Sequence, residues 1–119
     1  MGLNLTGTWK YREDFSYGDS EGVLELSHKG QVLTGILKHK EILLDGDSYT
    51  IHQELVGKVN VEEMSFSLVA NSFSILDSLE ELSYELDYFE AQLINENLIV
   101  GTTEDKQNVT GVFSFKRIL

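Results

Sequence analysis

The 119-residue chain contains neither cysteine nor proline. Without cysteine it has no disulfide framework, no thiolate metal ligand and no cysteine nucleophile. Without proline, the chain has to reverse direction at glycine, asparagine and aspartate. Gly22, Gly30, Gly46 and residues 95–97 stand where such turns are needed between apolar stretches.

Basic residues are scarce, because 9 lysines and arginines stand against 20 acidic residues and leave a net charge of −11. Binding to nucleic acid requires clustered basic side chains that neutralise phosphates. The densest basic runs, at 38–40 and 116–117, are short and far apart, which disfavours nucleic acid as a partner. Two interpretations of the acidic charge stay open: it attracts a basic protein partner, or it only keeps the chain soluble and monomeric.

Long apolar runs are absent as well. No run approaches the ~20 residues of a membrane span, and the N-terminus lacks the basic and apolar regions of a signal peptide. We therefore expect no membrane partner, and either a cytoplasmic protein or the mature form of a secreted one. With 41% hydrophobic residues, a chain of this length can bury its own core. One domain over residues 1–119 is the expected organisation.

Between the turn signals, apolar and polar residues alternate at period two, which is typical of half-buried strands. The pattern predicts strands at residues 5–15, 23–27, 32–39, 48–56, 59–70, 84–93, 98–103 and 110–118. Successive hairpins without a crossover describe a meander, and closing it removes the exposed sheet edges. We predict an all-β, eight-stranded antiparallel up-and-down barrel, with an open sandwich as the competing architecture.

The segment 77–93 carries two conflicting patterns. Residues 78–81 have the spacing of a helix capping box and begin an apolar pattern with three-four spacing. Residues 84–88 alternate instead, like a strand. We predict a short helical turn at 77–82 followed by a strand, and an amphipathic helix over the segment is the alternative.

The run Leu-Thr-Gly-Thr-Trp at residues 5–9 places a Gly-x-Trp signature near the start of the first predicted strand. It resembles the signature of the calycin-type barrels, which include the lipocalins, the avidins and the fatty-acid-binding proteins, and it looks especially like the avidin opening. The resemblance implies a lipocalin- or streptavidin-like barrel in which a basic side chain of the last strand packs over the tryptophan. Arg117 shares a strand face with Phe113 and Phe115, so we predict that it makes this structural contact with Trp9.

The chain departs from these families in ways that bear on its ligand. Trp9 is the only tryptophan, so the further tryptophans that wall the biotin site of avidins are missing. Residues 16–22 leave no room for the two-helix lid of a fatty-acid-binding protein, and the disulfides and C-terminal helix of lipocalins are lacking. The resemblance therefore implies an outlying member and disfavours biotin as its ligand.

Several polar residues share the apolar side of a predicted strand, where a carboxylate is costly to bury without a donor, a counter-ion or a ligand. Such residues would face the interior of a barrel that has space for one small ligand. We predict a small molecule in the open mouth of the barrel, held between aromatic walls and polar anchors. The walls are Tyr11, Tyr84 and Tyr88, and the anchors are Glu13, Gln53 and Glu90. The competing interpretation is that each polar residue faces water.

The sequence offers no motif for catalysis or for a metal or cofactor. His28 lies at a predicted turn, His39 in a basic run and His52 in mid-strand, and we expect all three to be solvated. No serine stands in a Gly-x-Ser-x-Gly setting, and no glycine-rich phosphate loop is present. The sequence therefore favours a non-enzymatic, small-molecule-binding barrel without a cofactor. The alternatives are an acidic protein-interaction module, such as an inhibitor or immunity-type protein, and, by analogy of fold alone, an enzyme.

Overall fold

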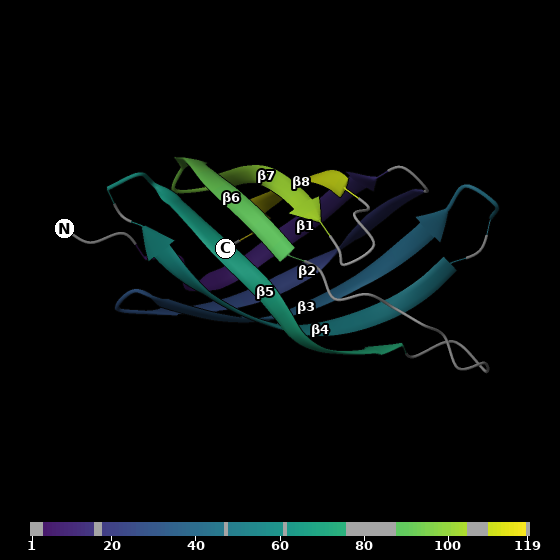
Figure 1. Ribbon diagram of the computed structural model, residues 1–119, viewed down its shortest axis with the longest axis horizontal. Coiled ribbons are helices and arrows are strands. Elements are labelled where there is room, and N and C mark those ends of the chain that lie inside the picture. Colours follow the sequence, from purple (N-terminus) through teal and green to yellow (C-terminus); the bar gives the residue numbers. More distant parts are fainter. Residues whose placement is uncertain are drawn as a thin grey trace.

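Eight antiparallel strands succeed one another in chain order around a closed barrel (Figure 1). The structure, a computed structural model, describes residues 4–15, 18–46, 48–60, 62–75, 88–104 and 110–118. Its strands are β1 (Gly7–Phe15), β2 (Gly18–Lys29), β3 (Val32–Leu43), β4 (Ser48–Asn60), β5 (Ser65–Ile75), β6 (Tyr88–Asn95), β7 (Leu98–Glu104) and β8 (Thr110–Arg117). Because β1 pairs with both β2 and β8, the sheet closes on itself. The prediction of an all-β, eight-stranded up-and-down barrel is confirmed.

The alternation within β1 shows how the sequence specifies the inside of the barrel. Trp9, Tyr11 and Glu13 are buried on its inner side, while Lys10 and Arg12 between them are exposed. The same period of two runs through the other strands, so leucines and aromatic rings from around the sheet meet in one core. Strand parity therefore decides which side chains enter the interior.

The barrel wall is taller on one side than on the other. β2, β3 and β4 contain 12, 12 and 13 residues, whereas β6, β7 and β8 contain 8, 7 and 8. Figure 1 shows the long strands extending beyond the short ones. At ~3.4 Å per residue, four further residues add ~14 Å along a strand. The inner side of β2–β4 therefore continues past the height at which β6–β8 end.

The predicted boundary between the fourth and fifth strands is wrong. β4 continues to Asn60, and the chain reverses at residues 62–64, where Met64 has a φ of 51°. Gly57, near which the sequence suggested the boundary, lies inside β4. A Cβ atom there would lie 1.7 Å from the carbonyl oxygen of Ser67 on β5. Glycine is needed at this position because two strands approach closely, not because the chain turns.

Gly22, also expected at a turn, lies inside β2, which begins at Gly18. A Cβ atom at Gly22 would lie 2.5 Å from the Cα atom of His39 on the paired strand. The other two predicted turn glycines, Gly30 and Gly46, have φ angles of 63° and 94° and lie in the hairpin turns expected for them.

Some predictions fall outside the described residues. They are the helical turn at 77–82, the wall residue Tyr84 and the last hairpin loop at 105–108. In the ranges that the structure does describe, the regular elements are strands, and no helix there has the length and apolar character needed to cross a membrane.

Candidate functional site

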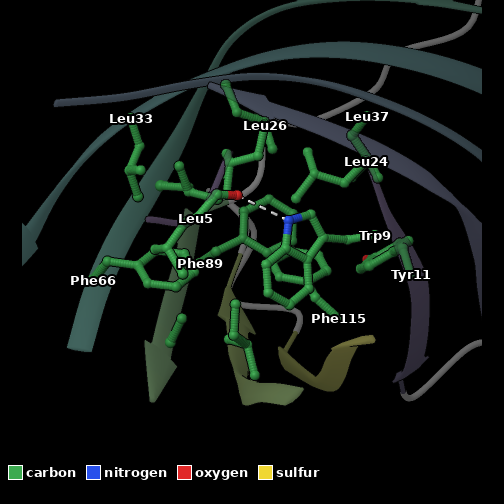
Figure 2. Packing of buried hydrophobic residues seen from close by; sticks show 14 of the residues in the cluster. Leu5, Trp9, Tyr11, Leu24, Leu26, Leu33, Leu37, Phe66, Phe89 and Phe115 are labelled. Atoms are coloured by element: carbon green, nitrogen blue, oxygen red, sulfur yellow. Dashed lines mark hydrogen bonds between the residues drawn. The ribbon is translucent and has the colours of Figure 1, made fainter. Parts of the chain in front are cut away.

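The end of the barrel at which β1 begins, here called the Trp9 end, is closed by side chains. Trp9 is completely buried, and its indole Nε1 donates a hydrogen bond of 3.0 Å to the carbonyl oxygen of Leu5 (Figure 2). The guanidinium carbon of Arg117 lies 4.3 Å from the centre of the indole ring, so the predicted contact is present. The guanidinium nitrogens also donate to three backbone carbonyl oxygens at 3.0–3.1 Å, those of Asn4, Thr6 and Glu96.

An aromatic layer crosses the barrel next to the Trp9 end. It consists of Tyr11, Phe89, Phe113 and Phe115, whose ring centres lie between 4.8 and 6.5 Å apart. The rings meet edge-to-face or tilted, as the quadrupoles of aromatic side chains favour. Completely buried leucines of β2 and β3 belong to the same core cluster. Up to this layer, the interior is filled with apolar side chains.

Beyond the aromatic layer, the inner side of the barrel becomes polar. Glu13 is only 7% exposed. The Tyr11 hydroxyl donates to one of its carboxylate oxygens, and Thr103 Oγ1 donates to the other at 2.6 Å. Gly111 leaves the necessary room, since a Cβ atom there would lie 2.5 Å from Glu13 Oε2 and 2.9 Å from Thr103 Oγ1. The two donors offset part of the cost of burying the carboxylate.

His39 of β3 is the centre of a second group of buried polar side chains. It is 2% exposed, its Nδ1 lies 2.6 Å from Ser20 Oγ on β2, and its Nε2 lies 2.7 Å from Gln53 Nε2 on β4. With the Gln53 amide in this orientation, His39 Nε2 is the acceptor and Nδ1 carries the proton. Ser20 therefore accepts from His39, and its hydroxyl donates to the carbonyl oxygen of Lys40 at 3.2 Å.

Burial keeps His39 neutral. Desolvation, with a smaller contribution from His52, lowers the pKa of His39 from 6.5 to about 4. A neutral imidazole with its proton on Nδ1 cannot take the proton of Ser20 through that nitrogen.

The ring of Tyr11 joins these two groups. Its centre lies 5.5 Å from that of the His39 ring, with 84° between the planes. We call the six side chains the polar cluster: Tyr11, Glu13, Ser20, His39, Gln53 and Thr103. All are between 0 and 7% exposed, and they come from β1, β2, β3, β4 and β7. Within the described ranges, no three His, Asp or Glu side chains are grouped so that they would hold a metal ion.

Three of the six residues predicted to bind a ligand meet in the polar cluster, namely Tyr11, Glu13 and Gln53. Tyr88 and Glu90 do not, because both are exposed on the outer face of β6. There the Tyr88 hydroxyl donates to Glu90, and this hydrogen bond raises the pKa of Tyr88 above its usual value. The expectation that these two residues face the interior is wrong.

The inner side of β6 is occupied by Phe89, Ala91 and Leu93, all of which are buried. The alternation in the sequence changes phase within residues 84–93. The prediction extended the alternation of residues 84–88 to Glu90. It therefore assigned the inner and outer faces of β6 the wrong way round.

The prediction of a solvated His39 is also wrong, and Ser20 and Thr103 were not identified as site residues. The basic run around His39 indicated a surface position. A second signal was available in the sequence, because His39 has the same parity as Leu33 and Leu37, which are completely buried. The lysines on either side face outward and the histidine between them faces inward.

No protein-family model matches the chain, and no curated protein matches it. Designed barrels among the solved structures do match. The redesigned β-barrel mFAP1, bound to DFHBI, is 13% identical, and the match covers 95% of this chain and 94% of that one with a TM-score of 0.67. A de novo designed fluorescence-activating β-barrel is 14% identical, with 94% of this chain and 92% of that one covered and a TM-score of 0.60. At these identities the likeness shows a shared β-barrel fold.

Proposed function

We propose that the chain is a non-enzymatic, calycin-like barrel that binds a small molecule at the polar end of its interior. The polar cluster carries this proposal, because five strands contribute buried polar groups to one half of an otherwise apolar interior. Small-ligand sites combine apolar walls with a few convergent polar groups, and here the aromatic layer supplies the apolar floor. The Gly-x-Trp opening and the contact of Arg117 with Trp9 support the calycin assignment.

The hydrogen bonds of the polar cluster add little net stability compared with an apolar interior of the same shape. A buried hydrogen bond contributes only ~0.5–1.5 kcal/mol net, and replacing both partners by apolar groups of similar shape is close to neutral. The Trp9 half of the same interior is filled with leucines and aromatic rings. Packing therefore does not account for polar side chains in this half of the interior, whereas the binding of a ligand does.

The hydrogen-bonding groups of the polar cluster restrict the chemistry of the ligand. Glu13 is an acceptor, neutral His39 adds an acceptor at Nε2, and Gln53 supplies an amide donor. Because these side chains already bond to one another, a ligand would replace some of their mutual hydrogen bonds. We expect a small, neutral or cationic molecule that donates a hydrogen bond to Glu13, since an anion would be repelled by the carboxylate.

Native mass spectrometry of freshly purified protein tests the proposal, followed by a thermal-shift screen of neutral and cationic small molecules. We expect a retained adduct, or compounds that raise the unfolding temperature. Glu13→Gln should weaken the binding of such a compound about 10- to 150-fold, because a hydrogen bond to a charged group contributes ~1.5–3 kcal/mol. Glu54→Gln is the matched control, since Glu54 is exposed on the outer face beside Gln53. Finding neither an adduct nor a stabilising compound, or equal weakening by both variants, would contradict the proposal.

A further inference from the structure

We infer that an acidic groove on the outer face of β1, β6, β7 and β8 docks an extended segment of a basic protein partner. The groove shares Thr103 with the polar cluster, but its carboxylates face outward, and the inference does not depend on the small-molecule ligand. The groove has a volume of about 750 Å³, and its lining includes Asp14, Glu90, Glu104 and Val112. Tyr88, which belongs to no interior site, also lines it.

The strand register sets four outward residues in one row across this groove. Glu90 of β6 pairs with Thr102 of β7. Thr102 pairs with Val112 of β8, and Val112 pairs with Asp14 of β1. All four are exposed. With ~4.8 Å between neighbouring strands, the row spans ~14 Å and carries a carboxylate at each end.

The carboxylates of the groove are available to a partner. In the described part of the chain, Asp14 and Glu104 form no ion pair, and Glu90 accepts a hydrogen bond from the hydroxyl of Tyr88 without meeting a cation. A second hollow shares Asp14, Thr102 and Val112 with the groove, and Arg12 is part of its lining. The net charge of −11 strengthens the attraction for a basic partner and opposes docking of a second copy of this chain.

An apolar contact lies between the two ends of the row. Val112 is 58% exposed and Tyr88 is 39% exposed. Single exposed apolar residues are ordinary on protein surfaces. Here Val112 and Tyr88 lie in the groove among its carboxylates. They provide a contact for one apolar side chain of the partner, with basic side chains of the partner on either side of it.

The length of the row fits an extended peptide. Residues i and i+4 of a strand lie ~13 Å apart on one side, and residue i+2 lies between them on that same side. A segment with the pattern basic-x-apolar-x-basic therefore places its cationic groups near Glu90 and Asp14 and its apolar side chain over Val112. Electrostatic attraction of this kind weakens as salt is added.

The test uses the dye-labelled peptide acetyl-Lys-Thr-Val-Thr-Lys-amide, with fluorescence anisotropy at ~0.02 M and ~0.5 M salt. We expect binding at low salt that weakens at high salt. The double variant Asp14→Asn, Glu90→Gln should bind about fivefold more weakly, as expected for the loss of two exposed ion pairs. The matched control is Glu62→Gln, Glu63→Gln, which changes the net charge equally at exposed turn residues that do not line the groove. The control should bind like the wild type.

Equal weakening by the two double variants would show that net charge alone attracts the peptide, and would overturn the inference. A third double variant, Glu25→Gln with Glu54→Gln, removes the carboxylates of a different outer hollow, on β2–β4. Selective weakening by that variant would also overturn the assignment. Sedimentation velocity provides a further check. A wild-type dimer that is abolished by Asp14→Asn with Glu90→Gln would also overturn the inference, because the groove would then bind a second copy of the chain.

Discussion

At the Trp9 end, polar side-chain atoms bond to the backbone, since the Trp9 indole donates to one carbonyl oxygen and the Arg117 guanidinium to three. At the polar end, side chains bond to side chains, as Tyr11 does with Glu13 and His39 does with Gln53. These four carbonyls lie outside the strands, at residues 4–6 and in the turn at 96, but a backbone acceptor has no rotamer to change, whereas a side-chain partner is lost with one rotamer change. The difference implies that the Trp9 end holds the barrel together and the polar end is able to exchange partners.

The largest expected effect lies at the Trp9 end. Trp9→Ala removes a completely buried indole and leaves Arg117 without its aromatic partner. We expect the free energy of unfolding to fall by ~3–5 kcal/mol, measured by urea unfolding with far-ultraviolet circular dichroism. Val23→Ala on the outer face should change it by less than ~0.5 kcal/mol. Similar losses for the two variants would mean that the Trp9 end is not the part that holds the barrel together.

The second effect depends on pH and belongs to the polar end. The pKa of His39 is about 4 in the folded chain against 6.5 in the unfolded chain, so below pH 6.5 the unfolded chain binds a proton that the folded chain does not. The stability linked to His39 is therefore fully present above pH 6.5 and is lost as the pH falls toward 4. Between pH 7 and pH 5 the loss is ~2 kcal/mol. Urea unfolding at several pH values in this range gives the free energy of unfolding as a function of pH. This free energy should fall less steeply with decreasing pH in His39→Gln than in the wild type. An identical pH dependence would contradict the burial of a neutral histidine.

The chain contains a matched pair of Tyr-x-Glu contacts, one on each face of the barrel. Tyr11 donates to Glu13 inside, and Tyr88 donates to Glu90 outside. Tyr11→Phe should cost ~1.5 kcal/mol, because a buried carboxylate loses a donor. Tyr88→Phe should change the free energy of unfolding by less than ~0.5 kcal/mol, because water replaces the lost partner. If urea unfolding gave equal losses, the distinction between the inner and outer contacts would fail.

The smallest expected effect concerns the hydrogen bond between Thr103 and Glu13. Thr103→Val should cost ~1 kcal/mol in the wild type and close to nothing in a Glu13→Leu background, because the acceptor is then gone. The double-mutant cycle therefore has a coupling of ~1 kcal/mol. Additive losses in the cycle would show that this bond does not contribute to the polar cluster.

The architecture was predictable because it follows from local patterns. Period two identified the inner face of β1, including the buried Glu13, and the Gly-x-Trp resemblance pointed to the pairing of Trp9 with Arg117. The boundary near Gly57 was not predictable, because a glycine in a turn and a glycine beneath a neighbouring strand look alike in the sequence. Only the approach of Ser67 distinguishes the two.

The candidate site was predictable in part, because parity assigns a face within a strand but not a neighbour on another strand. Ser20 meets His39 across the β2–β3 pair, whereas Thr103 of β7 reaches Glu13 of β1 only through the closure of the sheet between β1 and β8. His39 was overlooked because its charged neighbours outweighed its parity. Tyr88 and Glu90 were misplaced because the alternation of residues 84–88 in the sequence gives way, at the start of β6, to that of Phe89, Ala91 and Leu93.

The single buried indole under a guanidinium also means that tryptophan fluorescence comes from one end of the barrel alone. Trp9 is the only tryptophan and has no exposed surface, so its emission reports when water reaches that end of the molecule. The aromatic layer stands between the indole and Glu13. A ligand that settles on the polar cluster would therefore leave the emission wavelength almost unchanged, while unfolding would shift it to the red. The emission of Trp9 can thus follow unfolding in an unlabelled sample without a contribution from ligand binding.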